Sequence, residues 1–280
     1  MKPTTAVIFA AGIGTRMLPI TAAVQKELLP IGDRPVIDYI VSDLVAAGIT
    51  KIIIVIRPGQ TGLKDYFLGN AGLESQLRRL GKTAALEQLA RIHAQAEFVF
   101  VEQSEAAGYG TAIPLQVALP LLDPTQPVVV CGGDDLVWHP DGASEMQAFI
   151  KTYAHSGAEG AIMGLDLVDD ELSQFGIITS QTGEAGEYLT DILEKPTPGQ
   201  TPSRLANVSK YILNGAIRDY IQAVQPRAEN SESYIIDGIV ASSQSHKIII
   251  HHISGAYLDT GTLASWYKAN QVVNAASTLK

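Results

Sequence analysis

The chain has 280 residues, 46% of them hydrophobic and 18% charged, and a net charge of −9. This composition is that of a globular protein, and the acidic balance excludes the basic face that a nucleic-acid partner requires. The sequence contains no apolar run of about 18 residues, and Met1 and Lys2 lead straight into a short apolar run. We therefore expect a cytoplasmic protein with no membrane partner.

Short apolar runs alternate with longer segments of helical period in the first half of the chain. Fully apolar runs of this length are typical of strands buried on both faces of a parallel sheet, and they occur at 6–10, 52–56, 98–101 and 128–131. Apolar residues at helical spacing predict helices over 36–45, over 73–92 with a break near 81–83, and over 146–153. Gly48 is expected to stop the first helix.

The second half is more mixed, with strands expected at 161–165, 176–179 and 247–253 and a final helix from 262 to 274. No internal repeat, low-complexity tract or long linker separates the two halves. We therefore predict one α/β domain whose later elements extend the first sheet. Cys131 lies inside an apolar run and is expected to be a core residue.

The loop after the first strand contains Gly12 and Gly14, and it lies where a doubly wound sheet binds its ligand. Glycine lets backbone N–H groups approach an anion closely. The loop is not a dinucleotide fingerprint, because position 17 is Met, and it is not a Walker loop, because no Gly-Lys-Ser/Thr follows. Alone, the pattern fits a plain tight turn equally well. Two nearby cations, Arg16 and Lys26, favour an anion cradle over solvated surface charges.

A second strand end carries two carboxylates. Asp134 and Asp135 follow the apolar run 128–131, which suits a magnesium site at the same edge of the sheet. Adjacent residues at a strand end point to opposite sides. One of the two is therefore expected to face the metal, and the other to face solvent or a backbone group. A simple acidic turn is the alternative.

Several segments together resemble one enzyme family. GIGTRMLPIT followed by QKELLP is similar to the signature of the sugar-1-phosphate nucleotidyltransferases, and within them to the bacterial UTP–glucose-1-phosphate uridylyltransferases. The resemblance continues in the same order through LESQLRRLGKTAALEQL, QSEAAGYGTA, GGDD, FGII, LEKP, YIIDGIV and YLDTGT. The first of these, a helical insert, is usually lacking in thymidylyltransferase relatives.

The resemblance implies a fold and an organisation. The fold would be a Rossmann-like, mostly parallel twisted sheet with helices on both faces. Residues 1–280 would form a single nucleotidyltransferase domain, with a nucleotide-binding half over 1–140 and a sugar-binding half with the C-terminal helix over 141–280. A homo-oligomer, either a dimer or a tetramer, is implied as well.

The resemblance also implies a reaction and its residues. UTP and α-glucose 1-phosphate would condense to UDP-glucose and pyrophosphate with Mg²⁺, by in-line attack without a covalent intermediate. Arg16 would bind the triphosphate and Lys26 the reacting phosphates. The nucleotide would contact Ala11, Gly12, Gly14, Thr15, Gln103 and Gly108. The sugar phosphate would contact Gly176, Glu194 and Lys195, and the metal would be bound by Asp134 and Asp237.

Some motif residues have simpler local interpretations. Thr111 is expected to be the N-cap of the helix that follows it. Asp259 could be a third acid, but a capping role before the final helix is favoured. Without the resemblance, Asp237 would equally well lie on a helix surface or at an N-cap. His251 and His252 have no Cys or Glu at ligand spacing, so a zinc site is not expected.

Four positions depart from the family pattern: Ala22 stands in place of a lysine, Gln25 of a proline, Ile236 of a threonine, and Ser209 of a glycine near the sugar. The hydroxymethyl group of Ser209 would narrow the pocket or add a hydrogen bond. A sibling activity with dTTP or with N-acetylglucosamine 1-phosphate therefore stays open, as does a non-catalytic nucleotide-sugar sensor. A dinucleotide-dependent oxidoreductase is excluded, because the third glycine is missing and Arg57, not an acid, follows the second strand.

Overall fold

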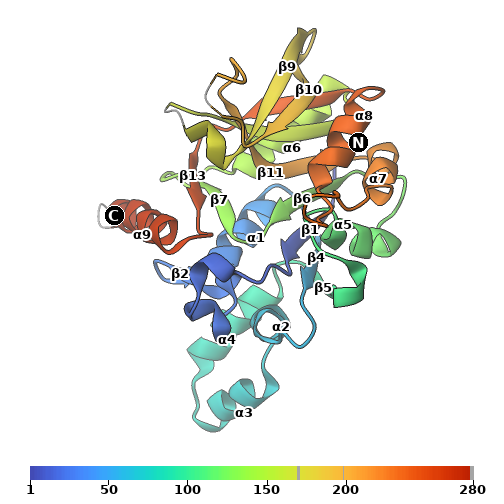
Figure 1. Cartoon of the computed structure of the whole chain (residues 1–280). Helices are drawn as coiled ribbons and strands as arrows, with labels where there is room; N and C mark the ends of the chain where they lie inside the picture. Colours follow the sequence, from blue (N-terminus) through green and yellow to red (C-terminus); the bar gives the residue numbers. More distant parts are fainter. Residues whose placement is uncertain (169–170, 198, 278–280) are drawn as a thin grey trace.

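The apolar runs predicted as strands lie side by side in one central sheet (Figure 1). The structure is a computed structural model, and it describes residues 1–168, 171–197 and 199–277. Nine strands of this described part form the sheet in the order β5-β4-β1-β6-β11-β8-β12-β10-β9. They are β1 (Thr5–Ala10), β4 (Lys51–Ile56), β5 (Glu97–Glu102), β6 (Val128–Gly132), β8 (Gly160–Asp166), β9 (Gly176–Gly183), β10 (Gly186–Glu194), β11 (Leu205–Leu213) and β12 (Ile248–His252).

The direction of the strands changes between the two halves of the chain. β5, β4, β1 and β6 run parallel to one another, as the apolar runs predict. β11 is antiparallel to both β6 and β8, and β10 is antiparallel to β12 and β9. Two short ribbons lie outside the sheet, β2 (Pro30–Ile31) with β3 (Arg34–Pro35) and β7 (Asp135–Trp138) with β13 (Ala256–Asp259).

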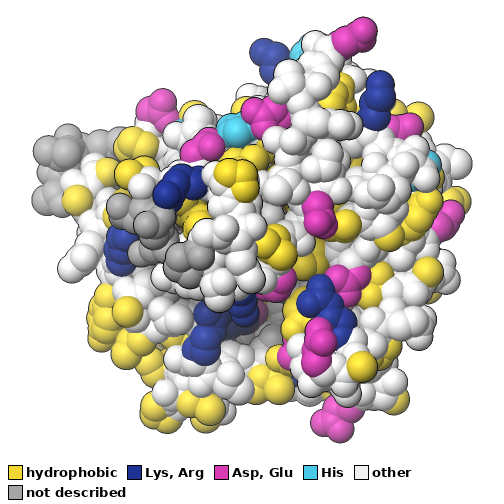
Figure 2. Space-filling view, turned by 45° about the horizontal axis from the view of Figure 1, so that its top comes forward, with side chains coloured by type: hydrophobic (Ala, Val, Ile, Leu, Met, Phe, Trp, Pro, Cys, Tyr) yellow, Lys and Arg dark blue, Asp and Glu magenta, His cyan; other side chains and the backbone are white. Residues whose placement is uncertain are grey.

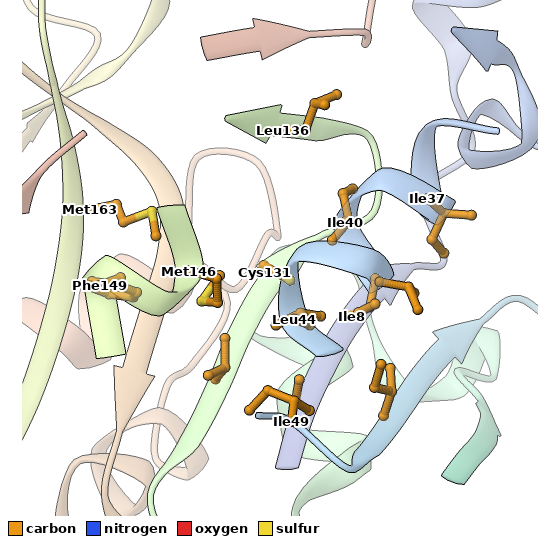
Figure 3. Close-up of a cluster of buried hydrophobic side chains, with 14 of the residues drawn as sticks. Ile8, Ile37, Ile40, Leu44, Ile49, Cys131, Leu136, Met146, Phe149 and Met163 are labelled. Atoms are coloured by element: carbon orange, nitrogen blue, oxygen red, sulfur yellow. The ribbon is translucent and has the colours of Figure 1, made fainter. Parts of the chain in front are cut away.

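Helices cover both faces of the sheet, and the expected α/β fold class is confirmed (Figure 1). α1 (Val36–Ala46), α2 (Gly62–Leu68), α6 (Glu145–Ser156) and α9 (Leu263–Ser277) supply apolar side chains to one cluster. α5 (Ile113–Ala118), α7 (Gly215–Gln222) and α8 (Ile235–Ser243) supply them to the other. Figure 3 shows the first cluster, in which Leu44 of α1 lies near Ile8 and Cys131 of the sheet, and Phe149 of α6 lies beside Met146 and Met163.

The alternation of side chains along each strand explains why both faces of the sheet are apolar. On β4, Ile52 and Ile54 belong to the first cluster, whereas Ile53 and Val55 belong to the second. Alternate side chains of a strand point to opposite faces, so a strand covered on both sides must be apolar throughout. Each fully buried Ile or Val side chain stabilises the fold by roughly 1.5–3 kcal/mol relative to an exposed one.

Most predicted helices are confirmed, and one helix start is corrected. The expected break divides the helical insert into α3 (Ala71–Arg79) and α4 (Thr83–His93), with Gly81 at a φ of 65° between them. The predicted N-cap role of Thr111 is wrong, because α5 begins at Ile113 and its N-cap is Ala112. The Thr111 hydroxyl instead accepts the backbone N–H of Ile235, at 3.0 Å, where α8 begins. Among the described residues, no helix combines the length and apolarity that crossing a membrane demands.

Candidate active site

A hollow of about 390 Å³ opens at the edge of the sheet where β1 and β6 end. The face shown in Figure 2 is hollowed, with Lys, Arg, Asp and Glu side chains close together around the hollow. The residues that line the 390 Å³ hollow are Phe9, Ala11, Gly12, Arg16, Lys26, Gln103, Tyr109, Gly110, Thr111, Pro114, Gly132, Asp134, Asp135, Ser209, Tyr211, Glu232, Ile235, Tyr257 and Asp259. The residues expected in the site and brought together here are Ala11, Gly12, Arg16, Lys26, Gln103 and Asp134.

The two glycines of the first loop are required for different structural reasons. A Cβ added at Gly12 would lie 3.2 Å from the Lys26 ammonium nitrogen, so glycine leaves room for the cation above the loop. Gly14 has a φ of 72°, a left-handed conformation that other residues adopt at a cost. Its carbonyl accepts the Thr21 hydroxyl at 2.8 Å, which fixes the turn. Gly14 and Thr15 thus shape the loop, although they do not line the hollow.

Lys26 is paired with the acid expected to bind the metal. Its ammonium lies 2.5 Å from Oδ2 of Asp134, across 108 residues of sequence. Burial lowers the pKa of Lys26, but Asp134 and Glu27 outweigh burial and hold this pKa above its ordinary value, so the charge is retained. Burial also raises the pKa of Glu27 to about 8, against the attraction of Lys26. Lys26 thus keeps its charge between two acids, Glu27 and Asp134, and lines the hollow.

The neighbouring acid has a different environment. Asp135 accepts a hydrogen bond from the Lys210 ammonium at 2.8 Å and one from the Tyr257 hydroxyl at 3.0 Å. Burial raises the pKa of Asp135, and the ion pair with Lys210 opposes this rise. The expectation that the two acids point to opposite sides is not met, because both line the hollow. They differ in their partners, since Asp134 pairs with Lys26 and Asp135 with the buried Lys210, not with solvent or a backbone cap.

A third acid, Asp259, reaches the hollow because β13 pairs with β7. Asp259 lies opposite Asp135 in this pairing, and the backbone N–H of Thr260 donates to the Asp134 carbonyl at 3.1 Å. The predicted capping role for Asp259 is wrong, because the Thr262 hydroxyl accepts the Ser265 N–H at the start of α9. Oδ1 of Asp259 accepts the N–H of Gly261 within the turn.

A buried acid on α6 holds the turn that precedes β13. Glu145 accepts hydrogen bonds from the backbone N–H groups of Ser254 and Gly255 and pairs with the rings of His139 and His251, at 2.7 and 2.9 Å. Burial raises the pKa of Glu145, but the bonds from His251, Gly255 and His139 outweigh it and hold the pKa at about 2. The acid is therefore ionised at neutral pH, and β13 is fixed beside β7.

The loop expected to contact the base closes the opposite side of the hollow. The Gln103 side-chain amide donates to the Gly108 carbonyl at 3.1 Å. A Cβ at Gly110 would lie 2.3 Å from the Ser233 carbonyl oxygen, so only glycine fits against that backbone. Ser233 donates its N–H to the Tyr109 carbonyl at 2.9 Å, which ties the loop to the segment before α8. Gly108 supports the loop but does not line the hollow.

The residues expected to bind the sugar phosphate lie close together, but they do not line the hollow. Gly176 and Glu194 are opposite each other on β9 and β10, and Lys195 follows with its ammonium 4.0 Å from Glu194 and 64% of its side chain exposed. The Lys195 N–H donates to the Phe175 carbonyl at 3.0 Å. These three residues share one end of the β9–β10 hairpin, and their roles stay predictions.

Asp237 is not brought to the other acids, so its expected metal role is corrected. It lies in the first turn of α8, and both of its carboxylate oxygens are bound by the Arg227 guanidinium, at 3.0 and 2.5 Å. It does not line the hollow, whereas Asp259 does. Local sequence could not separate the two acids, since each precedes or begins a helix. The position of Asp259 depends on a strand pairing about 120 residues apart in the chain.

Other lining residues were missed by sequence reasoning. Tyr109, Glu232 and Tyr257 line the hollow, and Lys210 supports it from beneath. Tyr257 belongs to the quoted segment YLDTGT beside Asp259, which was a usable signal. For Glu232, in the polar run before α8, the sequence holds no comparable signal.

The acids of the hollow suit a divalent cation only in part. Asp134 and Asp259 offer carboxylate oxygens, which are the ligands of a hard cation such as Mg²⁺. In the described residues, no group of three or more His, Cys, Asp or Glu side chains is arranged to hold a metal. Mg²⁺ is commonly bound through one or two carboxylates together with substrate phosphates and water. The donor set therefore fits a cation that arrives with a polyphosphate.

Comparison with known proteins agrees with this fold. The family model described as nucleotidyl transferase matches residues 5–276, and the chain belongs to this family. Two curated relatives are UTP–glucose-1-phosphate uridylyltransferases, which confirms the resemblance found in the sequence. The one named YngB, from Bacillus subtilis (strain 168), is 31% identical over 96% of this chain and 89% of its own length. The one from Pseudomonas aeruginosa is 31% identical over 93% of this chain and 92% of its own length.

Solved structures give the same result for the fold. An apo UDP-glucose pyrophosphorylase superposes with a TM-score of 0.87 at 28% identity, covering 98% of this chain and 99% of that one. A UTP-bound UGPase from Acinetobacter baumannii has a TM-score of 0.84 at 27% identity, covering 96% and 93%.

Loss of the buried ion pair between Lys210 and Asp135 should destabilise the folded protein. Lys210→Met leaves Asp135 buried without its cation, so the free energy of unfolding should fall by about 3–5 kcal/mol. The raised pKa of Asp135 should rise further, because Lys210 opposes that rise. When the pKa of a carboxyl is higher in the folded than in the unfolded protein, the free energy of unfolding falls as the pH rises from the lower pKa to the higher one. The loss of stability in Lys210→Met should therefore be larger at pH 8 than at pH 5. Chemical denaturation at both pH values measures this.

Lys64→Met is the matched control, because Lys64 and Glu102 are also 2.8 Å apart but partly exposed. Its effect should stay below about 1 kcal/mol. Equal losses for the two variants would contradict the structural role given to the buried pair.

Proposed function

We propose that the protein transfers the uridylyl group of UTP to α-glucose 1-phosphate, giving UDP-glucose and pyrophosphate in a reversible reaction. The observation that carries this proposal is the joining of the glycine loop, Arg16 and the Lys26–Asp134 pair in one hollow. The two curated relatives named UTP–glucose-1-phosphate uridylyltransferase support it across nearly the whole chain. The proposed unit is a single domain over 1–280, acting as a cytoplasmic homo-oligomer.

The proposed chemistry needs positioning and charge neutralisation more than proton transfer. In-line attack of the sugar phosphate on the α-phosphorus brings several negative oxygens together. Lys26 and Arg16 are the cations that line the hollow, and in an acidic protein they act as placed charges and not as part of a general positive field. Lys26 would neutralise the reacting phosphates, and Arg16 would bind the triphosphate through two parallel hydrogen bonds from its guanidinium.

The proposed cofactor is Mg²⁺, held by Asp134 and Asp259. When bound, it supplies positive charge between phosphate oxygens and lowers the cost of their approach. Because Asp134 also contacts Lys26, the two cations would share this carboxylate. The base would lie against Gln103 and the loop 108–111. The sugar would lie toward Gly176 and Glu194, with its phosphate near Lys195.

The reaction is tested by incubating the protein with nucleotide, sugar 1-phosphate and Mg²⁺ and following pyrophosphate release. We expect turnover with UTP and glucose 1-phosphate at a higher kcat/KM than with dTTP or with N-acetylglucosamine 1-phosphate. Preference for one of those substrates would assign a sibling activity. UDP-glucose binding by calorimetry, without turnover of any pair, would contradict the enzyme and favour a sensor.

Replacement of Lys26 tests the site itself. Lys26→Met removes a positive charge that acts on the reacting phosphates, so kcat should fall by about 10²–10³-fold. Lys64→Met removes a partly exposed lysine of α2 that does not line the hollow, and it should leave kcat unchanged. Steady-state kinetics of both variants, with circular dichroism to check folding, measures the difference. A folded Lys26→Met enzyme with wild-type kcat would remove Lys26 from the mechanism.

Replacement of Asp134, Asp259 or Asp237 should affect the Mg²⁺ dependence of activity in different ways. Asp134→Asn and Asp259→Asn should each raise the Mg²⁺ concentration needed for half-maximal activity by about tenfold or more, because each loses a charged oxygen ligand. Asp237→Asn weakens only a partly exposed ion pair with Arg227, so its Mg²⁺ dependence should match the wild type. Magnesium titration of activity measures all three. A shift confined to Asp237→Asn would restore the role first expected for that residue.

A further inference from the structure

Ser209 has an unusual backbone conformation for its place in the fold. It lies within β11, a strand inside the sheet, yet its φ is 54°, in the left-handed region. Asn207 pairs with Gly164 and Tyr211 with Ile162, so four residue steps on β11 face two on β8. This bulge turns Ser209 out of the ladder. Bulges of this kind redirect a side chain and are frequent beside functional sites.

The bulge is held in place by side chains. The buried Asn207 accepts the Ser209 N–H at 2.9 Å and donates its own amide to the Tyr211 hydroxyl at 2.9 Å. Asn207 thereby replaces hydrogen bonds that the ladder cannot supply at this point. The conformation of Ser209 is therefore built into the strand.

The result of the bulge is to expose one side chain in the hollow. Ser209 is exposed, whereas the rest of β11 is buried, and Ser209 lines the hollow beside Tyr211. The position also indicates which substrate it meets. β11 lies beyond β6 from β1, on the side away from the glycine loop, and its first residues pair with Ile177 and Ile178 of β9, next to Gly176.

The conformation itself does not call for a serine. A left-handed backbone favours glycine, and a residue with a Cβ adopts it at a cost in stability. Strained residues of this kind concentrate at ligand sites. A hydroxymethyl group at a position where glycine would fit more easily adds a hydroxyl to the lining of the hollow, where it interacts with the Tyr211 hydroxyl and is also open to a ligand.

We propose that Ser209 is a specificity-determining residue, whose hydroxyl contacts the hexose ring of the sugar 1-phosphate. The inference rests on the proposed function and adds one contact to it. A single hydrogen bond to a substrate hydroxyl separates sugars that differ only in the position of that hydroxyl. Ser209 would therefore act on the choice of sugar and leave the binding of UTP unchanged.

The test compares Ser209→Ala, which keeps the Cβ and loses the hydroxyl, with Ser209→Gly, which loses both. For each, kcat/KM is measured with the 1-phosphates of glucose, galactose and mannose, and KM is measured for UTP. For the sugar that the wild type prefers, kcat/KM should fall about tenfold in both variants, and it should fall less for the other two sugars. KM for UTP should stay within about twofold of the wild type.

A matched control is Ser231→Gly. Ser231 has a φ of 59° but lies in the loop before α8 and does not line the hollow. Both glycine variants relieve a left-handed serine, so neither should have a lower Tm than the wild type. Only Ser209→Gly should alter the preference among sugars.

The outcomes separate this inference from the proposed function. A wild type that is active, with Ser209 variants that keep its sugar preference, overturns the role of Ser209 alone. A raised KM for UTP with an unchanged sugar preference also overturns it, in favour of a nucleotide contact. A wild type inactive with every sugar 1-phosphate overturns the proposed function and this inference together.

Discussion

β1 and β6 are neighbours in parallel register, with Phe9 opposite Gly132, so the segments that follow them leave the sheet at the same edge. The first segment carries the glycine loop and Lys26, and the second carries Asp134. Their pairing at 2.5 Å follows from this register, although the two residues are 108 positions apart. A slip of this register would misplace both segments and force the closely packed side chains on both faces of the sheet to repack.

Two groups of buried charges support this edge of the sheet. Asp135 and Lys210 form a buried pair under the hollow, and Glu145 holds the turn that brings β13 beside β7. Buried pairs of this kind contribute little net stability, but each partner makes the other indispensable. Their effect here is positional, because they fix the backbone that presents Asp134 and Asp259. An acidic protein can thus direct two cations toward a polyphosphate without a basic surface.

The sequence was most informative where one local pattern determines the outcome. Apolar runs such as 52–56 predicted strands correctly, since a strand covered on both faces must be apolar throughout. Helical spacing predicted α1, α6 and α9, and Gly81 marked the break in the helical insert. Thr111 was misassigned, because its hydroxyl binds a backbone N–H 124 residues away and not the next helix. Asp237 and Asp259 could not be ranked by sequence, since each is a single acid beside a helix.

The sequence by itself determined the α/β class, the glycine loop and the cations and acids that follow β1 and β6. These features depend on residue type and on spacing within a short stretch of chain. Only the tertiary structure decided that Asp259 lines the hollow, that Asp237 forms an ion pair with Arg227, and that a bulge turns Ser209 out of its strand. The physical reason is that each of these depends on pairing between distant segments, and strand pairing and bulges are set by packing partners that no local pattern specifies.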